Sequence, residues 1–468
     1  MAPATGHVHD LLGIGIGPFN LGLACLAAPL EDLDAVFLDA KDAFDWHPGL
    51  MLEDATIQVP FLADLVTLAD PTSPYSFLHY LKRTGRLYPF YIREDFNPLR
   101  AEYSAYCRWA SEQLDSLRLG RDVVGVERDP ADDAYVVTAR TAAGTEQRRA
   151  RRLVLGVGTV PAVPAGVDPA AGTVLHTSDY LPRREELLGR GSVTVLGSGQ
   201  SAAEVYRDLL ERSGADGPRV DWITRSPRFF PMEYTKLTLE LTSPEYVDHF
   251  HGLGADRRDR LNREHASLYK GISAELVNDI HELLYRRSVH GHPAGLLTTS
   301  TTLTGVEQDG RDLVLALHDD ELERGWRHPT GALVLATGYR AEVPGFLAPV
   351  LDDIAWDPAG RYDVSRDYAV DHERSRIWVQ NAEVHTHGLT SPDLGMGAYR
   401  NSVILRAVTG REVYPVEPAI AFQTFGVPRG AAQDVPRDIP RDIPRDIPQE
   451  TAWPPAPRPP VSPPPAAS

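Results

Sequence analysis

Two stretches in which glycines come after a short apolar run constrain the fold of this chain most. The first reads "LLGIGIGPFNLGL" over residues 11–23, and the second reads "SVTVLGSGQSAAEVYRDLLERSG" over residues 192–214. Glycine at alternate positions is poor material for a core. It suits a tight turn between a strand and a helix, where a diphosphate approaches the N–H groups at the helix start. Each stretch therefore predicts a strand, a turn and a helix of the dinucleotide-binding kind.

The first turn is expected to bind a dinucleotide through Gly13, Gly15 and Gly17. Pro18 takes the third position of the glycine fingerprint, and proline is well suited to a first helical turn. Asp39 ends the next apolar run, where a carboxylate can accept hydrogen bonds from ribose hydroxyls. A purely structural turn is the alternative, which the acid-terminated second strand makes less favourable.

The second turn differs from the first in the residue that ends its next strand. Gly197 and Gly199 lead into the helix, with Ala202 at the third fingerprint position, and the next strand ends with Arg225 in "ITRS". A cation in the place of an acid suits the 2′-phosphate of NADP rather than NAD. An ordinary surface arginine is the alternative.

Two dinucleotide-binding folds in one chain suggest a flavoprotein whose flavin is reduced by NADPH. The cysteine content then limits which class of flavoprotein is possible. The only cysteines, Cys25 and Cys107, form no Cys-x-x-Cys pair, which excludes the usual structural zinc site and the flavin disulfide reductases. Flavin monooxygenases need no such pair. The spacing of Gly172, His176 and Tyr180 matches a linker pattern of that class, although coincidence explains it equally well.

Charge and hydropathy bear on the partners and the compartment of the protein. The formal net charge is −18, which argues against nucleic acid as a partner. The sequence has no apolar run of membrane-span length and no secretory signal, so we expect a cytoplasmic protein without a membrane partner. His385 and His387 have metal-like spacing, but no carboxylate or cysteine motif completes a site, and we predict no metal.

Alternating strand-like and helix-like segments predict an α/β fold with two Rossmann-like dinucleotide-binding domains and a smaller helical substrate subdomain. Strand signals fade after Arg228, and "AELVNDIHELLYRRSV" has helical spacing. The tail repeats Asp-(Val/Ile)-Pro-Arg and is then proline-rich, which predicts disorder. The expected boundaries are 8–185 and 330–425 for a discontinuous FAD domain, 186–228 and 295–330 for the NADPH domain, 229–294 for the helical subdomain and 427–468 for the tail.

Five stretches in this order carry a more specific resemblance. They read "GIGPFNLGLA", "FDWHPGLMLEDATIQVPFLADLVTLADPTSPYSFLHYL", "LGSGQSAAEVYRDL", "LVLATGY" and "VHTHGLTSPDLGMGAYRNS". From Asp10 to Phe425 the chain resembles the microbial N-hydroxylating flavin monooxygenases of siderophore biosynthesis. Members hydroxylate the side-chain amine of lysine or ornithine, or diamines such as cadaverine and putrescine. The resemblance implies that NADPH reduces FAD, that O2 forms a C4a-hydroperoxyflavin, and that a neutral primary amine becomes a hydroxylamine.

The resemblance also assigns roles to single residues. Gln58 is expected to act in catalysis, and Trp46 and His47 to line the flavin, with core packing as the alternative for the last two. Asp393 and Leu394 are expected near the isoalloxazine. The other residues expected at the cofactors are Gly13, Gly15, Gly17, Pro18, Asn20 and Asp39 for FAD, Gly197, Ser198, Gly199, Gln200, Ser201 and Arg225 for NADPH, and Thr337 and Gly338 in the "ATGY" turn.

One departure from the family pattern bears on the substrate. Members that act on amino acids typically read Phe-Leu-Lys-Asp-Leu where this chain has Ala63 as the central residue. The missing lysine is expected to bind the substrate carboxylate, and leaving that carboxylate buried without a cation costs about 3–5 kcal/mol. "RFFPMEYTKLTLELTSPEY" is also most similar to the cadaverine-type branch. We therefore predict a diamine, cadaverine ahead of putrescine.

Three alternatives stay open. Lys236 could supply the carboxylate contact, which would make the chain an L-lysine 6-monooxygenase. The chain could instead be another flavin monooxygenase, or a non-catalytic flavoprotein that senses redox state. The expected partners are a small primary amine and O2, and we expect a homo-oligomer.

Overall fold

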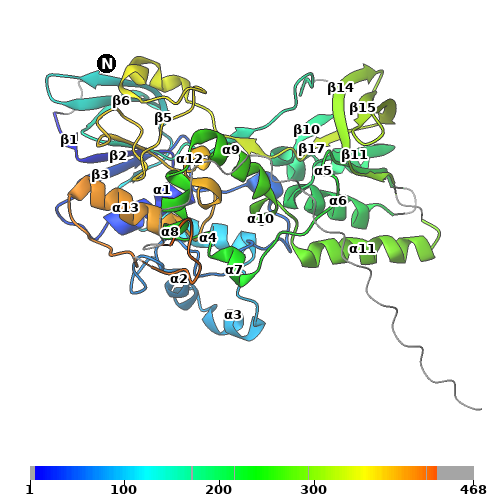
Figure 1. Cartoon of the computed structure of the whole chain (residues 1–468), viewed down its shortest axis with the longest axis horizontal. Coiled ribbons are helices and arrows are strands. Elements are labelled where there is room, and N and C mark those ends of the chain that lie inside the picture. The colour runs from blue at the N-terminus through cyan, green and yellow to red at the C-terminus, as the bar shows by residue number, and fades with distance from the viewer. Residues whose placement is uncertain (1–5, 170–171, 215–216, 293–294, 418, 429–468) are drawn as a thin grey trace, which may run out of the picture. The chain divides into compact units, whose positions relative to one another are not determined.

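The computed structural model describes residues 6–169, 172–214, 217–292, 295–417 and 419–428. Residues up to Phe425 form one unit, which holds two parallel sheets with helices around each (Figure 1). The fold is therefore mixed α/β, as the sequence predicts. Residues 429–468 of the predicted tail lie outside the described residues.

The two large sheets each have five strands, and all strands within each sheet are parallel. The first has the order β19 (Ile377–Val379), β8 (Leu153–Leu155), β2 (Leu11–Ile14), β3 (Ala35–Leu38) and β4 (Leu117–Arg118). The second has the order β10 (Val174–His176), β17 (Leu333–Leu335), β11 (Ser192–Leu196), β12 (Arg219–Ile223) and β13 (Leu297–Thr298).

Smaller sheets accompany the large ones. One has the order β1 (Val8–His9), β7 (Gly144–Ala150), β6 (Ala134–Thr141) and β5 (Asp122–Asp129), in which only the β1–β7 pair is parallel. An antiparallel sheet has the order β14 (Thr301–Asp309), β15 (Asp312–Asp319) and β16 (Arg324–Thr330). A two-stranded antiparallel pair joins β9 (Val160–Pro161) to β18 (Tyr339–Arg340).

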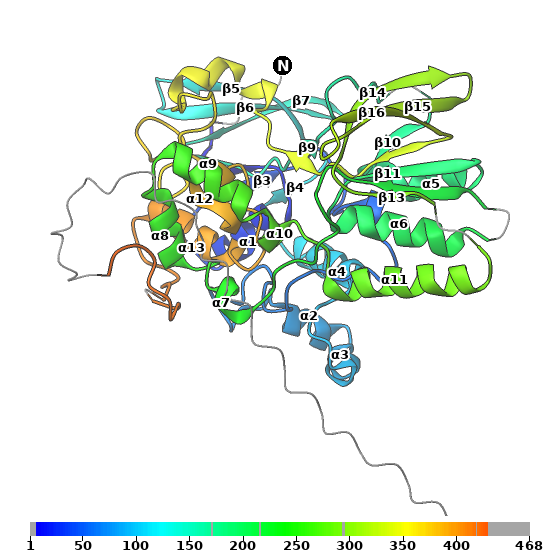
Figure 2. The ribbon, with the colours of Figure 1, turned by 45° about the vertical axis from the view of Figure 1, so that its right-hand side comes forward.

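The helices surround these sheets (Figures 1 and 2). The α-helices are α1 (Pro18–Ala27), α2 (Phe77–Arg83), α3 (Leu87–Arg93), α4 (Arg100–Ser111), α5 (Tyr180–Leu188), α6 (Gln200–Arg212), α7 (Lys236–Leu239), α8 (Pro244–His251), α9 (Ala255–Glu264), α10 (Ala266–Tyr269), α11 (Ala274–Val289), α12 (Val384–His387) and α13 (Gly397–Thr409). The 3-10 helices are η1 (Pro48–Leu50), η2 (Thr177–Asp179), η3 (Gly345–Asp353) and η4 (Gly388–Thr390).

The two large sheets are built by the same sequence of steps. A strand, a glycine turn, a helix and a second strand come first, as β2–α1–β3 and as β11–α6–β12. Further helices and one more parallel strand, β4 or β13, come next. Three antiparallel strands follow, and the chain then returns to place β8 beside β2, or β17 beside β11. The central strands are buried on both faces, as parallel sheets covered by helices require.

This repeated plan corrects the predicted boundaries in two places. The prediction assigned residues 174–185 and 330–425 to the first domain. In the structure β10 and β17 pair with the second sheet, on the same side of β11. The physical reason is the return of the chain after the antiparallel strands, which brings "LVL" at 333–335 back beside its own first strand. The second five-stranded sheet therefore includes β10 and β17, which the prediction had assigned to the first domain.

The predicted helical subdomain at 229–294 is also divided. The expected helix at 274–289 is present as α11, which lies beside α6 (Figure 2). Its apolar side chains Leu276, Val277 and Ile280 pack into the same core as the apolar side chains of α6. Tyr246 and Phe250 of α8 instead pack with Leu389, a residue of η4. The segment thus covers two different parts of the unit, because its apolar faces match two different partners. Among the helices of the described residues, none is long and apolar enough to cross a bilayer.

Candidate functional site

A cavity of about 1410 Å³ opens at the carboxyl ends of the first sheet and reaches the start of α6. Its volume exceeds the roughly 300–1,000 Å³ of pockets that hold one small molecule. Twelve of the predicted site residues line it: Gly15, Gly17, Pro18, Asn20, Asp39, Trp46, His47, Gln58, Gln200, Ser201, Asp393 and Leu394. Residues of the first glycine turn, the first residues of α6 and the C-terminal segment therefore meet at one cavity.

The first glycine turn brings the backbone of β2 against that of β8. Gly15 has φ +87°, and a β-carbon on it would lie 2.4 Å from the carbonyl oxygen of Gly156. Gly17 lines the cavity at the N-terminus of α1, where a β-carbon would meet nothing within 4 Å and where the first N–H groups of a helix have no partner within the helix. Asn20 holds this turn: its Nδ2 donates to the Gly15 carbonyl at 2.8 Å, and its Oδ1 accepts from Gln380 at 2.7 Å.

Asp39 lies at the end of β3, beside the same turn. Its carboxylate accepts the N–H of Ile16 at 2.6 Å and the N–H of Lys41 at 2.8 Å. The side chain is only 9 % exposed, but it lines the cavity. Asp39 therefore fixes the turn, and its remaining lone pairs can accept hydrogen bonds from a ligand in the cavity.

The second glycine turn lies further from the cavity. Gly197 has φ +151°, and a β-carbon there would lie 2.2 Å from the Ala336 carbonyl oxygen. Gly197, Ser198 and Gly199 are outside the cavity wall, whereas Gln200 and Ser201, which begin α6, are part of it. Arg225 is exposed just after β12, next to this turn, since Gly197 donates its N–H to the carbonyl of Ile223 at the end of that strand. Arg225 also lies outside the cavity wall.

An aromatic wall borders the cavity between the two sheets. The ring centroids of Trp46 and His47 are 5.0 Å apart, and His47 is 5.9 Å from Tyr339. The His47 ring is open to the cavity, yet desolvation by the protein around it, with the nearby charges of Arg100 and Lys41, lowers its pKa to about 4. His47 is therefore a neutral hydrogen-bonding group at physiological pH.

Gln58 is part of a hydrogen-bond chain that joins the two halves of the unit. Its Nε2 donates to Gln200 Oε1 at 3.0 Å, and Gln200 Nε2 donates to Glu204 at 3.0 Å. Glu204 is paired with Arg100 through two bonds of 3.0 and 2.8 Å. Gln200 Oε1 also accepts the Ser273 N–H at 2.8 Å. The expected catalytic amide is thus held by residues of α6 and α4.

The two predicted substrate residues are placed differently from expectation. Lys236 begins α7 but is exposed and outside the cavity wall, so the structure does not bring it to the expected substrate position. Lys270 lines the cavity instead. Ala63 is buried and is not part of the cavity wall. A β-carbon on Gly395 would lie 3.8 Å from the β-carbon of Ala63.

The "ATGY" turn serves the connection between the two sheets. Thr337 donates its hydroxyl to the carbonyl of Ala162, and the Gly338 carbonyl accepts the Ala162 N–H at 2.9 Å. His176 Nε2 lies 3.0 Å from the same Gly338 oxygen. Thr337 and Gly338 are outside the cavity wall, but the next residue, Tyr339, is part of it. These residues therefore position the wall rather than form it.

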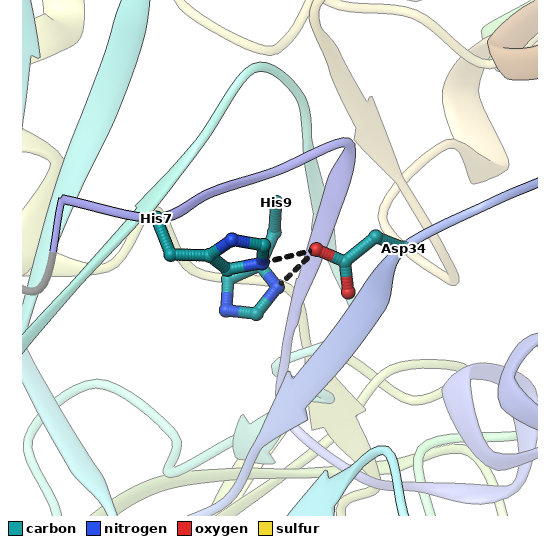
Figure 3. Close-up of side chains that lie close together, drawn as sticks. All are labelled: His7, His9 and Asp34. Atoms are coloured by element: carbon teal, nitrogen blue, oxygen red, sulfur yellow. Dashed lines mark hydrogen bonds and ion pairs between the residues drawn. The ribbon is translucent and has the colours of Figure 1, made fainter.

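His385 and His387, the two histidines with metal-like spacing, each lie within hydrogen-bond distance of a backbone carbonyl. His385 Nε2 lies 2.7 Å from the Tyr362 carbonyl oxygen, and His387 Nε2 lies 3.2 Å from that of Arg366. A different group, which the sequence analysis missed, lies on the surface away from the cavity. His7 and His9 both reach Asp34 Oδ2, at 2.5 and 2.9 Å (Figure 3).

The surface group has a donor set that Zn²⁺ accepts, with two imidazoles and one carboxylate. In the structure these groups satisfy one another by hydrogen bonds. The signal in the sequence was His-x-His on one side of a strand, but the partner acid is distant along the chain. His7, His9 and Asp34 do not line the cavity.

The sequence has no cofactor fingerprint for other cavity residues, although two of them, Met232 and Tyr234, lie in the stretch 228–246 that resembles the cadaverine-type branch. Among them are Arg100, Met232, Tyr234, Asn262 and Lys270. They come from helices and loops whose sequences carry no cofactor fingerprint. Only the packing of the chain brings them to the wall.

Comparison with known proteins gives a consistent result. A family model described as L-lysine 6-monooxygenase/L-ornithine 5-monooxygenase matches residues 7–341. A putrescine N-hydroxylase from Shewanella oneidensis is 48% identical over 420 residues, which are 89% of this chain and 84% of that protein.

Solved structures are similar over the same extent. The FAD-bound cadaverine monooxygenase of the desferrioxamine pathway of Erwinia amylovora is 50% identical, with a TM-score of 0.89, over 90% of this chain and 99% of that one. An ornithine N-hydroxylase from Kutzneria, solved with reduced FAD, NADP+ and L-ornithine, is 30% identical with a TM-score of 0.81, over 87% and 100% of the two chains.

Proposed function

The chain belongs to the family of L-lysine 6-monooxygenases and L-ornithine 5-monooxygenases, and on that premise we propose that it N-hydroxylates one terminal amine of an aliphatic diamine, using FAD and NADPH. Cadaverine is the favoured substrate, ahead of putrescine. The product is a hydroxylamine for a hydroxamate siderophore. The observation that carries the choice of a diamine is Ala63, in the position where amino-acid hydroxylases of the family have a carboxylate-binding lysine.

The residues of the cavity fit the two cofactors. The diphosphate of FAD suits the open N-terminus of α1, where Gly17 leaves room and Asp39 has acceptor positions for a ribose. NADPH suits the start of α6, with Arg225 for the 2′-phosphate. When bound, FAD accepts two electrons from NADPH and supplies the chemistry that activates O2. In the balanced reaction, amine, O2, NADPH and a proton give hydroxylamine, NADP+ and water.

The protein must present the amine without its proton. An alkyl ammonium has an ordinary pKa of about 10.4, so its deprotonation at pH 7 costs about 4.6 kcal/mol. The cavity wall includes Val59, Leu239, Leu268, Leu389 and Leu394, and an apolar surrounding lowers the pKa of an ammonium. Neutral His47 and the amide of Gln58 add no positive charge to this surrounding.

Direct comparison of substrates tests the proposed function. We expect kcat/KM to be higher for cadaverine than for lysine, and Ala63→Lys to reduce the cadaverine-to-lysine ratio about thirtyfold, which corresponds to about 2 kcal/mol. The physical reason is that a lysine repels the remote ammonium of a diamine and attracts a carboxylate. Leu62→Lys adds the same charge at an exposed neighbour, 43% exposed, and should leave the ratio unchanged. Faster hydroxylation of lysine by the unsubstituted enzyme would show the assignment to be wrong.

L-Lysine is the second candidate, and one observation favours it. Lys270 lines the cavity and offers a cation for a substrate carboxylate. If lysine is the better substrate, Lys270→Ala should weaken its use and spare cadaverine.

The choice of nicotinamide cofactor is tested at Arg225. Arg225→Ala is expected to raise the KM for NADPH at least tenfold and to leave the KM for NADH nearly unchanged, because a hydrogen bond to a charged group contributes about 1.5–3 kcal/mol. Arg228→Ala is a matched control, since that exposed guanidinium lies 5.8 Å from the Phe230 ring centroid. Equal losses with both cofactors would remove the 2′-phosphate role.

The homo-oligomer and the cytoplasmic location remain predictions. Tyr88, Tyr91 and Ile92 of α3 are 73, 68 and 72% exposed, and they are the side chains that we propose for contacts between copies.

A further inference from the structure

The cavity wall contains several carboxylates, which differ in their partners. Asp122 and Asp259 are already paired with Arg140 and Arg361 at 2.8 and 2.9 Å. Asp39 accepts two backbone N–H groups beside the first glycine turn. These three are therefore satisfied without a ligand, either by an arginine or by the turn.

Three further wall carboxylates, Asp45, Glu233 and Asp393, have no ion pair within 4 Å among the described residues. Of these, Asp393 is half-buried and lies close to Ala63, across Gly395. It precedes α13, and its Oδ1 accepts the Met396 N–H at 3.3 Å. Arg400, whose charge acts on Asp393, is instead paired with Glu383 at 3.1 Å, and both of these side chains are buried. Burial raises the pKa of Asp393, so a cation that enters the cavity would relieve the cost of enclosing this carboxylate.

The position of Asp393 relates it directly to the substitution at Ala63. Gly395 lies between them: a β-carbon on Gly395 would be 2.9 Å from Asp393 Oδ1 and 3.8 Å from the Ala63 β-carbon. A lysine at position 63 would therefore extend from a point close to this carboxylate. Tyr234 lines the same cavity as Asp393, and burial, together with the charge of Asp393, raises the pKa of its hydroxyl.

We propose that Asp393 forms a subsite for the remote ammonium of the substrate, so that it selects a diamine by charge while the other amine reacts. This inference rests on the proposed function and deepens it. Where an amino-acid hydroxylase holds a carboxylate with lysine, this chain offers a small apolar Ala63 and an acid. The non-reacting end of the substrate is thus bound by a negative side chain here and by a positive side chain in the amino-acid hydroxylases.

The charge explains selectivity better than shape does. A monoamine such as n-pentylamine has the same carbon chain as cadaverine but lacks the second ammonium. Pairing of that ammonium with a desolvated carboxylate is a charge-assisted hydrogen bond, and removal of one partner leaves the other charge buried alone. Asp393 should therefore matter for cadaverine and hardly at all for n-pentylamine.

The test compares two substrates in two variants. Asp393→Asn keeps the size of the side chain and removes its charge, and Glu282→Gln removes an exposed charge on α11, outside the cavity wall. We measure kcat/KM for cadaverine and for n-pentylamine, with FAD content and the rate of flavin reduction by NADPH as controls. In Asp393→Asn we expect about a hundredfold loss for cadaverine, a change within about threefold for n-pentylamine, and unchanged controls. Glu282→Gln should change kcat/KM for neither substrate by more than about threefold.

The other outcomes separate the possible errors. If cadaverine and n-pentylamine lose equally, or if the FAD content falls, Asp393 has a structural or cofactor role and the subsite is wrong. If cadaverine turnover survives in Asp393→Asn, another group binds the ammonium. Preference of the unsubstituted enzyme for lysine overturns the proposed function itself, and with it the subsite, before any variant is made.

Discussion

Replacing Gly15 with alanine is expected to destabilise the protein by about 2–5 kcal/mol and to abolish FAD retention. The left-handed backbone at φ +87° costs a residue with a β-carbon about 1–2 kcal/mol. The new methyl group would also lie 2.4 Å from the Gly156 carbonyl oxygen, and overpacking of this kind typically adds about 1–3 kcal/mol. Because β2 and β8 are neighbours in the sheet, the strain spreads to the turn that is to hold the diphosphate. Thermal unfolding of the apoprotein and the flavin absorbance of the purified protein measure the two effects.

Gly17→Ala is the matched control, two residues further along the same turn. Its φ is −87°, and a β-carbon there meets nothing within 4 Å. We therefore expect the apoprotein to keep its unfolding midpoint, while FAD binds more weakly, since the methyl group enters the space proposed for the diphosphate. A stable, flavin-loaded Gly15→Ala protein would contradict the strain argument. Normal FAD binding by Gly17→Ala would place the diphosphate elsewhere.

The parts of the fold that local sequence determines could be predicted. The glycine spacing around Gly15 and Gly197 reflects close contacts with Gly156 and Ala336, which leave no room for a side chain. The amphipathic pattern that predicts α11 is likewise a property of one continuous segment. The resemblance of the motifs also identified the family, which the comparisons confirm.

Pairings between distant segments could not be predicted in this way. The run "LVL" at 333–335 reads as a buried strand in either sheet, and only its pairing with β11 assigns it to the second. The sequence also could not show which residues around α7 face the cavity. Tyr234, Thr238 and Leu239 line the wall, whereas Lys236, the alternative carboxylate contact, does not. The proximity of Asp393 to Ala63 likewise depends on the packing of two segments that the sequence separates.

Glu204→Gln is expected to destabilise the protein by about 3–5 kcal/mol, because it leaves the Arg100 guanidinium buried without its anion. The two side chains are 5 and 12% exposed, and they meet through two hydrogen bonds. Arg100 also donates to the Leu50 carbonyl at 3.0 Å, so it cannot easily turn toward water. Arg327 and Glu307, an exposed pair on the β14–β16 sheet, offer a control, and Arg327→Met should leave the unfolding midpoint unchanged.

A double substitution measures how much of this stabilisation comes from the interaction between Arg100 and Glu204 and how much from each side chain alone. Arg100→Met with Glu204→Leu removes both charges, and replacement of a whole buried pair by apolar residues is often nearly neutral. We therefore expect the double variant to be more stable than either single variant, with a coupling free energy of about 2–3 kcal/mol in denaturant titrations. Additive losses would mean that Arg100 and Glu204 stabilise the protein independently.

The same cycle has a consequence for catalysis that stability alone does not predict. Glu204 Oε1 accepts from Gln200, whose own Oε1 accepts from Gln58, so the acid of α6 fixes an amide in the cavity wall. In the double variant the charges are balanced but Gln200 has lost its acceptor. We expect that variant to regain stability without regaining kcat, about tenfold below that of the unsubstituted enzyme, since a misplaced group in an active site costs rate rather than stability. Recovery of both together would show that Gln58 needs no support from the second fold.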